Sequence, residues 1–273
     1  MKIIALTENT SQQAWPVEHG LSLYIELNGL HILFDMGQSN LFAENAARKG
    51  IDLEKVDLAI LSHGHYDHGG GLKTFLQMNS HAPVYVHRRA FEPHYSLRSN
   101  GLHYIGLNTE LQYHPNLKFC DSYTYINNQL QLFTQTEGKY LCPPGNRLLF
   151  GPALDTPDTF CHEQSLLISE GHLRVLIAGC AHTGIINILQ KAQQLSTHPI
   201  THVFAGMHLT KSGLTATEEA AFIKQLAEKL LAYPGCHYYT MHCTGIEAYT
   251  QLKQYMQDRI NYLSTGDDII VQI

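Results

Sequence analysis

The sequence predicts an α/β chain folded as a four-layer αββα sandwich, in which two sheets face each other and helices cover the outside. Short β-branched and aliphatic runs alternate with helix-like patterns along the chain, in two halves. In the second half, three such runs are followed by loops that carry histidine, and these runs lie at 174–178, 202–205 and 237–240. Runs of this length and composition are typical of strands. Layers of sheet and helix bury the apolar face of each element.

Size and composition narrow the class of protein. The chain has 273 residues, 44% of them hydrophobic, which is enough for one large core or two modest ones and excludes an intrinsically disordered protein. No low-complexity segment marks a linker, so we expect one domain, 1–273. The net charge is −6, and Lys and Arg form no long run. A nucleic acid is therefore not an expected partner.

Cysteine usage and hydropathy indicate the compartment. There are six cysteines, and none of them forms a C-x-x-C pair. In a chain of this length they predict reduced thiols in a cytoplasmic protein. No apolar run reaches the length of a membrane span, and the first residues are too short for a leader segment. We expect a small-molecule substrate and no membrane partner, and a homo-oligomer is left open.

The first half opens with a strand and a hairpin. Residues 2–6 form an aliphatic run, and residues 21–27 alternate apolar and polar side chains as a half-buried strand does. Asn28-Gly29 is a strong two-residue turn signal. The returning strand is expected at 31–35.

A further predicted strand leads into the motif Ser62-His63-Gly64-His65-Tyr66-Asp67-His68, which three glycines follow. Alternate side chains of extended backbone share a side, so His63, His65 and Asp67 point one way, and His68 departs from them as the chain turns. The spacing predicts two sub-sites, with His63 and His65 binding one ion and Asp67 and His68 its neighbour. Imidazole with carboxylate suits zinc, iron or manganese, and the glycines allow a sharp bend with space above the ions. The alternative is a polar loop that is merely histidine-rich.

Asp35 ends the returning strand of the hairpin, which should lie beside the strand that leads into the motif. A carboxylate in that place often orients a ligand histidine by a hydrogen bond to its second nitrogen. The alternative is a turn residue before Gly37. The first interpretation is favoured because the two strands should be neighbours.

Between residues 87 and 160 the regular pattern fades, and Tyr, Asn, Gly and Pro are frequent. A long stretch of weak periodicity in a compact domain is often a lid or a binding insert. The alternative is a set of short edge hairpins, with strands at 118–120, 130–133 and 147–150. The candidate substrate contacts in this segment are His87, Arg88 and Tyr104.

The second half has candidates for the remaining metal ligands. An ion in a catalytic site needs about three protein ligands and an open position, so the motif leaves one ligand per ion to be found. His182 and His242 each follow a predicted strand and precede a helix. A lone histidine is usually a surface or hydrogen-bonded residue, but these two would complete the coordination. His182 is assigned to the ion of His63 and His65, and His242 to that of Asp67 and His68.

The His-x-His-x-Asp-His motif resembles the signature of the metallo-β-lactamase superfamily. Three further segments narrow this resemblance to a subgroup that includes dihydropterin–ribofuranosylaminobenzene-phosphate synthases. They are Gly179-Cys180-Ala181-His182-Thr183-Gly184-Ile185, Gly206-Met207-His208-Leu209 and His242-Cys243-Thr244-Gly245. The similarity covers both ends of the chain well and the middle loosely. It implies a metallo-β-lactamase-like fold with a binuclear site for two divalent ions, zinc in preference to iron or manganese.

The resemblance also exposes one departure from the family pattern. An aspartate at about the position of His208 commonly bridges both metals in the superfamily, and this chain has no acid there. The second ion would be held less firmly, or another group would bridge. His208 could instead donate a hydrogen bond to the substrate. Asp67 and His208 are therefore the candidates for a direct part in catalysis.

These features predict a metal-dependent hydrolase. Two neighbouring cations lower the pKa of a shared water and polarise a phosphoryl or carbonyl oxygen. Helix N-termini predicted after Thr183 and Thr244 would present N–H groups to an anionic, phosphate-bearing substrate. Both threonines are thus candidate substrate contacts, with ordinary helix capping as the alternative.

Three other functions remain open at this point. The first is a synthase that condenses a dihydropterin pyrophosphate with a ribofuranosylaminobenzene phosphate. The second is a di-iron redox protein of the same fold, although such proteins typically carry glutamate at the position of His65. The third is a non-catalytic protein that binds zinc or a partner.

Overall fold

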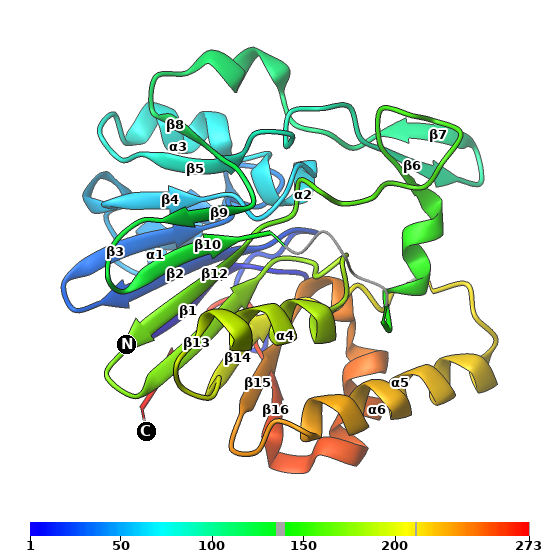
Figure 1. Ribbon diagram of the computed structural model, residues 1–273. Coiled ribbons are helices and arrows are strands. Elements are labelled where there is room, and N and C mark those ends of the chain that lie inside the picture. Colours follow the sequence, from blue (N-terminus) through cyan, green and yellow to red (C-terminus); the bar gives the residue numbers. More distant parts are fainter. Residues whose placement is uncertain (135–139, 211, 273) are drawn as a thin grey trace. The chain divides into compact units, whose positions relative to one another are not determined.

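The computed structural model describes residues 1–134, 140–210 and 212–272. The chain divides into two compact units. The N-terminal unit comprises residues 1–121 and 263–272, and the C-terminal unit comprises residues 122–262. Each unit contains a sheet and helices (Figure 1). Each sheet has seven strands, and each unit has a hydrophobic core of its own.

The sheet of the N-terminal unit has an antiparallel part and a parallel part. In spatial order its strands are β17 (Asp268–Ile270), β1 (Lys2–Thr7), β2 (Ser22–Leu27), β3 (Leu30–Phe34), β4 (Leu58–Ile60), β5 (Val84–His87) and β8 (Leu117–Cys120). Pairing is antiparallel from β17 to β3 and parallel from β3 to β8. The helices α1 (Leu41–Arg48) and α3 (Leu72–Met78) bury apolar side chains such as Phe42 and Phe75 in the core of this unit.

The hairpin predicted at Asn28-Gly29 is confirmed. Leu27 pairs with Leu30, and the turn residues have φ values of 51° and 82°. Positive φ at both central positions is what a two-residue turn between twisted strands requires, and Asn-Gly tolerates it. The returning strand β3 pairs with β4, and the N–H of Asp35 donates to the carbonyl of Ile60 at 2.9 Å. Asp35 therefore lies beside the strand that leads into the histidine motif.

The C-terminal unit repeats the combination of sheet and helix. Its strands, in spatial order, are β16 (Ile260–Tyr262), β15 (His237–Thr240), β14 (His202–Ala205), β13 (Leu173–Ala178), β12 (Ser165–Glu170), β10 (Leu130–Phe133) and β9 (Tyr123–Tyr125). Its helices are α4 (Ile185–Leu195), α5 (Ala216–Leu231) and α6 (Ile246–Met256) (Figure 1). They share one apolar core with the sheet. The strands β13, β14 and β15 are adjacent and parallel. Their carboxyl ends lie at one edge of the sheet, where the loops carrying His182, His208 and His242 begin.

The segment 87–160 is more regular than its sequence predicted. Besides β8, β9 and β10 it contains β6 (Tyr95–Arg98), β7 (Gly101–Tyr104), β11 (Leu149–Phe150) and two 3-10 turns, Thr109–Tyr113 and Pro144–Leu148. The strands predicted at 118–120 and 130–133 are confirmed, whereas 147–150 is strand only at its end. β8 and β9 each lie at one edge of a large sheet, and partial exposure there weakens the hydrophobic alternation. Residues 135–139 of the predicted insert lie outside the described residues.

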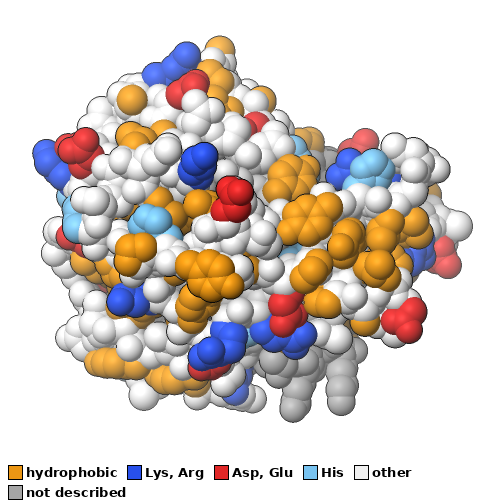
Figure 2. Space-filling model, turned by 90° about the horizontal axis from the view of Figure 1, so that it is seen from above, with side chains coloured by type: hydrophobic (Ala, Val, Ile, Leu, Met, Phe, Trp, Pro, Cys, Tyr) orange, Lys and Arg blue, Asp and Glu red, His pale blue; other side chains and the backbone are white. Residues whose placement is uncertain are grey.

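Charged side chains of both signs mix at the surface. Arg88 pairs with Asp121 at 2.7 Å, and Arg89 pairs with Glu92 at 2.9 Å. On the face drawn in Figure 2, Lys and Arg side chains lie apart from one another or beside acidic ones. The Arg88-Arg89 pair is therefore largely neutralised locally. Among the described residues, no helix has both the length and the apolar character needed to cross a membrane.

His202 predicts a pH dependence of stability. Burial, and secondly the neighbouring His237, lower the pKa of this side chain from 6.5 to about 4. The folded protein then binds fewer protons than the unfolded chain, so stability falls as the pH drops from 6.5 towards 4. We expect a loss of about 3 kcal/mol across that window. Urea unfolding at several pH values measures this dependence. His202→Gln should flatten the plot of stability against pH, whereas the exposed control His198→Gln should leave it as in the wild type. Equal slopes in all three proteins would contradict the assignment to His202.

Candidate metal site

The histidine motif follows β4 and ends in a short helix. Tyr66–Gly69 form the single turn α2, which leads through two glycines into α3. His63 and His68 are fully buried, and His65 and Asp67 are nearly so. The motif lies between a strand and a helix, as its sequence predicted.

The side chains of His63 and His65 converge. Nε2 of His63 lies 3.0 Å from Nδ1 of His65, and the ring centroids are 4.5 Å apart. Two nitrogens bound to one tetrahedral zinc ion at about 2.0–2.1 Å are roughly 3.3 Å apart. The pair therefore has a spacing that fits a shared ion, as expected for the first sub-site.

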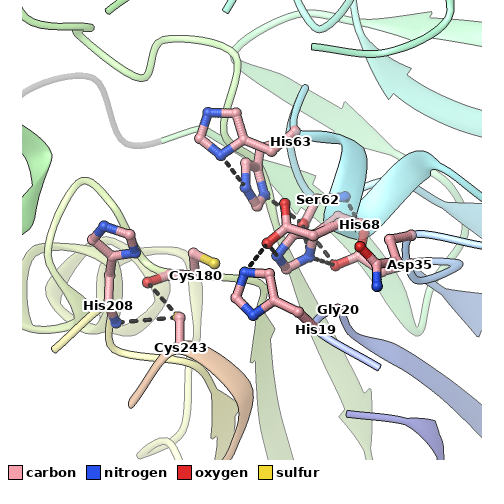
Figure 3. Close-up of polar contacts among 12 residues, drawn as sticks. His19, Gly20, Asp35, Ser62, His63, His68, Cys180, His208 and Cys243 are labelled. Carbon is pink, nitrogen blue, oxygen red and sulfur yellow. Dashed lines mark hydrogen bonds and ion pairs between the residues drawn. The ribbon is translucent and has the colours of Figure 1, made fainter. Parts of the chain in front are cut away.

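Asp35 orients two histidines of the motif (Figure 3). It has a left-handed conformation (φ 59°), and its carboxylate is fully buried. Its Oδ2 lies 2.6 Å from Nδ1 of His68, and its two oxygens accept the N–H and the hydroxyl of Ser62, each at 2.7 Å. Oγ of Ser62 lies 2.8 Å from Nδ1 of His63. Because the serine proton goes to Asp35, His63 donates to Oγ. Both imidazoles thus carry a proton on Nδ1, which leaves Nε2 to bind a metal.

Asp67 lies near His68, its expected partner at the predicted second sub-site. Oδ2 of Asp67 is 4.0 Å from Nε2 of His68, so a small movement would bring both to one ion. The same oxygen lies 3.2 Å from Nε2 of His19, a partly exposed side chain. His19 was not predicted, since it lies in a loop without any recognisable motif.

The glycines after the motif serve close packing. A Cβ at Gly70 would lie 2.2 Å from the carbonyl oxygen of Gln38, and one at Gly71 would lie 2.2 Å from that of Met36. Gly70 and Gly71 have helical backbone angles. The expectation that these glycines permit a sharp bend is therefore wrong: they let the backbone of the loop after β3 approach the motif.

Asp35→Asn is expected to weaken zinc binding about 10- to 100-fold. The amide still fills the space, but its NH₂ group faces donors from Ser62 and His68 and cannot hold both. Zinc titration against a competing chelator measures the change. The exposed carboxylate Asp52 offers the control Asp52→Asn, which should bind zinc as the wild type does. Unchanged affinity in Asp35→Asn would remove the orienting role.

In the C-terminal unit, His182 is held by an amide. Its Nδ1 lies 3.0 Å from Oδ1 of Asn146, and Nδ2 of Asn146 donates to the carbonyl of His182 at 2.7 Å. Because an amide oxygen only accepts, His182 carries its proton on Nδ1 and has its lone pair on Nε2. The ring also stacks on Phe160, with centroids 4.4 Å apart. The orientation of this candidate ligand is thus fixed on two sides.

A buried carboxylate organises the loop that carries His182. Glu163 accepts the N–H of His182 at 2.7 Å through one oxygen, and the N–H and hydroxyl of Thr183 at 2.9 and 2.7 Å through the other. Burial raises the pKa of Glu163, although these hydrogen bonds act in the opposite direction. Glu163 was not predicted, because it is far from the loop in sequence.

His242 lies in a one-turn 3-10 helix, His242–Thr244, directly after β15. It is fully buried and has a left-handed backbone conformation with φ of 51°. The turn is held by Thr244, whose hydroxyl lies 2.5 Å from that of Thr240 and accepts the N–H of Met207 at 2.9 Å. The backbone of the turn therefore sets the place of this candidate ligand.

His208 lies with two cysteines rather than with a carboxylate (Figure 3). Ligand atoms of Cys180, His208 and Cys243 all lie within 4.8 Å of one another, and we call these three residues the thiol cluster. The N–H of His208 donates to Sγ of Cys243 at 3.2 Å. Burial raises the pKa of the Cys243 thiol, but hydrogen bonding with Cys180 and His208 and the electrostatic influence of the His242 and His208 rings outweigh burial and hold that pKa well below its usual range.

The candidate substrate residues have other partners. The hydroxyl of Thr183 donates to Glu163, and that of Thr244 bonds to Thr240 and to the N–H of Met207, so both have structural roles. Arg88 forms its ion pair with Asp121, and the Tyr104 hydroxyl donates to the carbonyl of Leu107 at 2.9 Å. His87 is buried at the end of β5, and burial lowers its pKa. We therefore do not assign Thr183, Thr244 or Arg88 to the substrate.

Comparison with known proteins shows the family and the fold of this chain. The family model described as the metallo-beta-lactamase superfamily matches residues 15–187. An uncharacterised protein of Methanocaldococcus jannaschii is 29% identical over 257 residues, which cover 91% of this chain and 93% of that protein. A second protein of that organism, a 7,8-dihydropterin-6-methyl-4-(beta-D-ribofuranosyl)-aminobenzene-5'-phosphate synthase, is 26% identical, with 97% and 95% of the two chains covered.

A solved structure shows the fold. The crystal structure of Tm1679, a metal-dependent hydrolase of the beta-lactamase superfamily, matches with a TM-score of 0.83 and 29% identity over the whole of both chains. The predicted α/β class and metallo-β-lactamase fold are therefore confirmed. The resemblance to synthase-like relatives, recognised from the loops around His182, His208 and His242, is confirmed as well.

Proposed function

This chain belongs to the metallo-β-lactamase superfamily, and we propose that it is a metal-dependent hydrolase that acts on a small, phosphate-bearing substrate. One observation supports the proposal most directly: the fixed tautomers of His63, His68 and His182. Each of these rings has its Nδ1 bonded to an oxygen atom of the chain. Metal-binding histidines typically have such a partner on the nitrogen that does not bind the metal.

The donor set supports divalent transition metals. Five imidazoles and one carboxylate suit zinc, and they also suit iron or manganese. We propose two ions, one with His63, His65 and His182 as ligands and the other with Asp67, His68 and His242. Each ion then has three protein ligands and keeps a position for water or substrate. When bound, such ions lower the pKa of water and polarise a phosphoryl oxygen.

The residues of the chain have separate tasks in this proposal. Asp35 and Asn146 keep the ligand imidazoles in the binding tautomer. Asp67 contributes negative charge beside His68, which favours a cation at the second sub-site. His208, which the sequence suggested as a hydrogen-bond donor to the substrate, is not assigned to catalysis, because its backbone and ring contact Cys243 and His182.

Preference for an anionic substrate rests on two helix N-termini. The helices α4 and α6 begin after Gly184 and Gly245, and neither has a side-chain cap. The alternative of ordinary helix capping by Thr183 and Thr244 is therefore not supported. Uncapped N–H groups at a helix start attract phosphate.

A substrate panel tests the proposal. The purified protein, stripped by a chelator and reloaded with zinc, manganese or iron(II), is assayed with phosphomonoesters, phosphodiesters, pyrophosphate, a lactone and a thioester. We expect metal-dependent phosphoester or pyrophosphate turnover. Turnover that survives metal removal would falsify the proposal. Activity confined to the lactone or the thioester would contradict the preference for phosphate.

The synthase is the second candidate, because a relative with that name matches 97% of this chain. The protein is incubated with a dihydropterin pyrophosphate and the phosphorylated aromatic partner, and products are separated by mass. A condensed product without phosphoester turnover would favour the synthase. Oxygen consumption by the iron-loaded protein would instead favour the redox alternative. This alternative is less favoured because His65 stands where di-iron proteins of this fold typically carry glutamate.

A further inference from the structure

We propose that Cys180, His208 and Cys243 bind a zinc ion through two thiolates and one imidazole. This thiol-cluster site is additional to the six histidine and aspartate ligands assigned above. It does not rest on the proposed reaction, because it concerns the coordination of a metal and not the substrate.

The topology of the C-terminal unit brings the three side chains together. Cys180 follows β13, His208 follows β14 and Cys243 follows β15, each two or three residues beyond the last residue of its strand. These strands are adjacent and parallel. Three successive loops at one edge of the sheet therefore each contribute one metal-binding side chain. Positions beyond the carboxyl ends of parallel strands are the usual ligand sites of such sheets.

The spacing of the ligand atoms fits a metal. All three lie within 4.8 Å of one another. Zinc binds cysteine sulfur at about 2.3 Å and histidine nitrogen at about 2.0–2.1 Å, so ligand atoms of a tetrahedral site are roughly 3.5–3.8 Å apart. An inward movement of about 1 Å at the longest edge is enough. Two thiolates and an imidazole leave one position open, and thiolates favour zinc over magnesium or calcium.

The backbone around the thiol cluster is strained and closely fitted. Ala181, His208 and His242 have positive φ values of 51°, 46° and 51°. Non-glycine residues in this conformation cost energy, and they concentrate at functional sites. Gly206 leaves space for the sulfur, because a Cβ there would lie 2.6 Å from Sγ of Cys243. The loops thus maintain an unfavourable backbone that directs both sulfur and imidazole to one point.

The ordinary alternative is that the thiols simply fill space as small apolar groups. Cys236 is an example in the same unit, since it is fully buried within the apolar core. The thiol cluster differs because it includes a histidine whose Nδ1 is buried and has no hydrogen-bond partner among the described residues. A buried polar nitrogen without a partner is costly. A metal bound through that nitrogen would remove the cost.

Binding conserves charge and atoms in a simple way. Each thiol loses its proton to solvent as its sulfur–zinc bond forms, so one zinc ion displaces two protons. His208 binds through a nitrogen lone pair and releases none if it is neutral. No oxidant or reductant is needed.

Cobalt(II) substitution tests the site on the full-length chain. Thiolate–cobalt bonds give an intense near-ultraviolet charge-transfer absorption, whereas histidine and carboxylate ligands do not. We expect this absorption when stripped wild-type protein is titrated with cobalt(II), and we expect zinc to abolish it. X-ray absorption of the zinc-loaded wild type should show sulfur at about 2.3 Å. Absence of both signals overturns the proposal, and this arm needs no variant.

Variants assign the signal to residues. Cys180→Ser and Cys243→Ser should each weaken the absorption strongly, and the double variant should lose it. The matched control Cys161→Ser should keep it. The double variant His63→Ala with His65→Ala should also keep the charge-transfer absorption, even if hydrolysis is lost. Failure of the proposed function and failure of this inference are therefore distinguishable. Absorption that persists in the double cysteine variant, or that the control abolishes, would assign the sulfur ligands elsewhere and overturn the inference.

Discussion

Alanine in place of His63 is expected to lower metal-dependent turnover by about 10³-fold, because the loss of several kcal/mol of charge stabilisation acts directly on the rate. His63 is fully buried and lies 3.0 Å from His65 and beside Ser62. Its removal would leave the proposed first ion with two protein ligands and open space in which water competes for the metal. The zinc content should therefore fall by about one ion per chain.

The measurement pairs turnover with metal content. Both are determined on the same preparation, with His81→Ala as the control, because His81 is an exposed histidine of the same unit. A retained thermal transition shows that the fold survives. If His63→Ala lost zinc but kept the turnover of the wild type, the ion at this position would not act in the reaction.

Much of the fold was predictable because its signals are local. The Asn28-Gly29 turn, the aliphatic strand β13 and the alternation in β2 each depend on neighbouring residues. Of the edge strands in the middle segment, β8 was predicted only as part of the alternative interpretation and β9 was not predicted, since their side chains are only partly buried and no strict alternation marks them. The purpose of Gly70 and Gly71 was mistaken because it depends on the carbonyl groups of a distant loop.

The candidate site shows the same division between local and distant information. The short spacing of His63, His65, Asp67 and His68 could be recognised from the sequence, and Asp35 followed from the pairing of β3 with β4. Asn146 and Glu163 could not be found in this way. Each bonds to the His182 loop across 19 or more residues of chain and belongs to no motif. Cys180 and Cys243 stood beside the expected ligands, but only the strand order shows that they meet His208.

Among single substitutions at the candidate site residues of the C-terminal unit, Glu163→Ala should give the largest loss of stability. It leaves three donors, two of them backbone N–H groups, without their acceptor in a buried place. Each buried donor without a partner costs about 1–3 kcal/mol, so we expect the free energy of unfolding to fall by about 3–5 kcal/mol. The absence of the carboxyl's own desolvation cost offsets only part of this. Because the same donors shape the loop of His182, zinc affinity should fall about 10- to 100-fold as well.

Glu163→Gln separates the two effects of this carboxylate. The amide keeps the volume and one acceptor oxygen, so the protein should fold with an intermediate loss of stability. Its NH₂ group, however, faces a donor from His182 or Thr183, which should displace the loop and weaken zinc binding nearly as much as alanine does. Urea unfolding of the metal-free protein gives the first quantity and zinc competition gives the second, with the exposed Glu228→Gln as control. A glutamine variant with wild-type zinc affinity would show that Glu163 stabilises the fold without positioning His182.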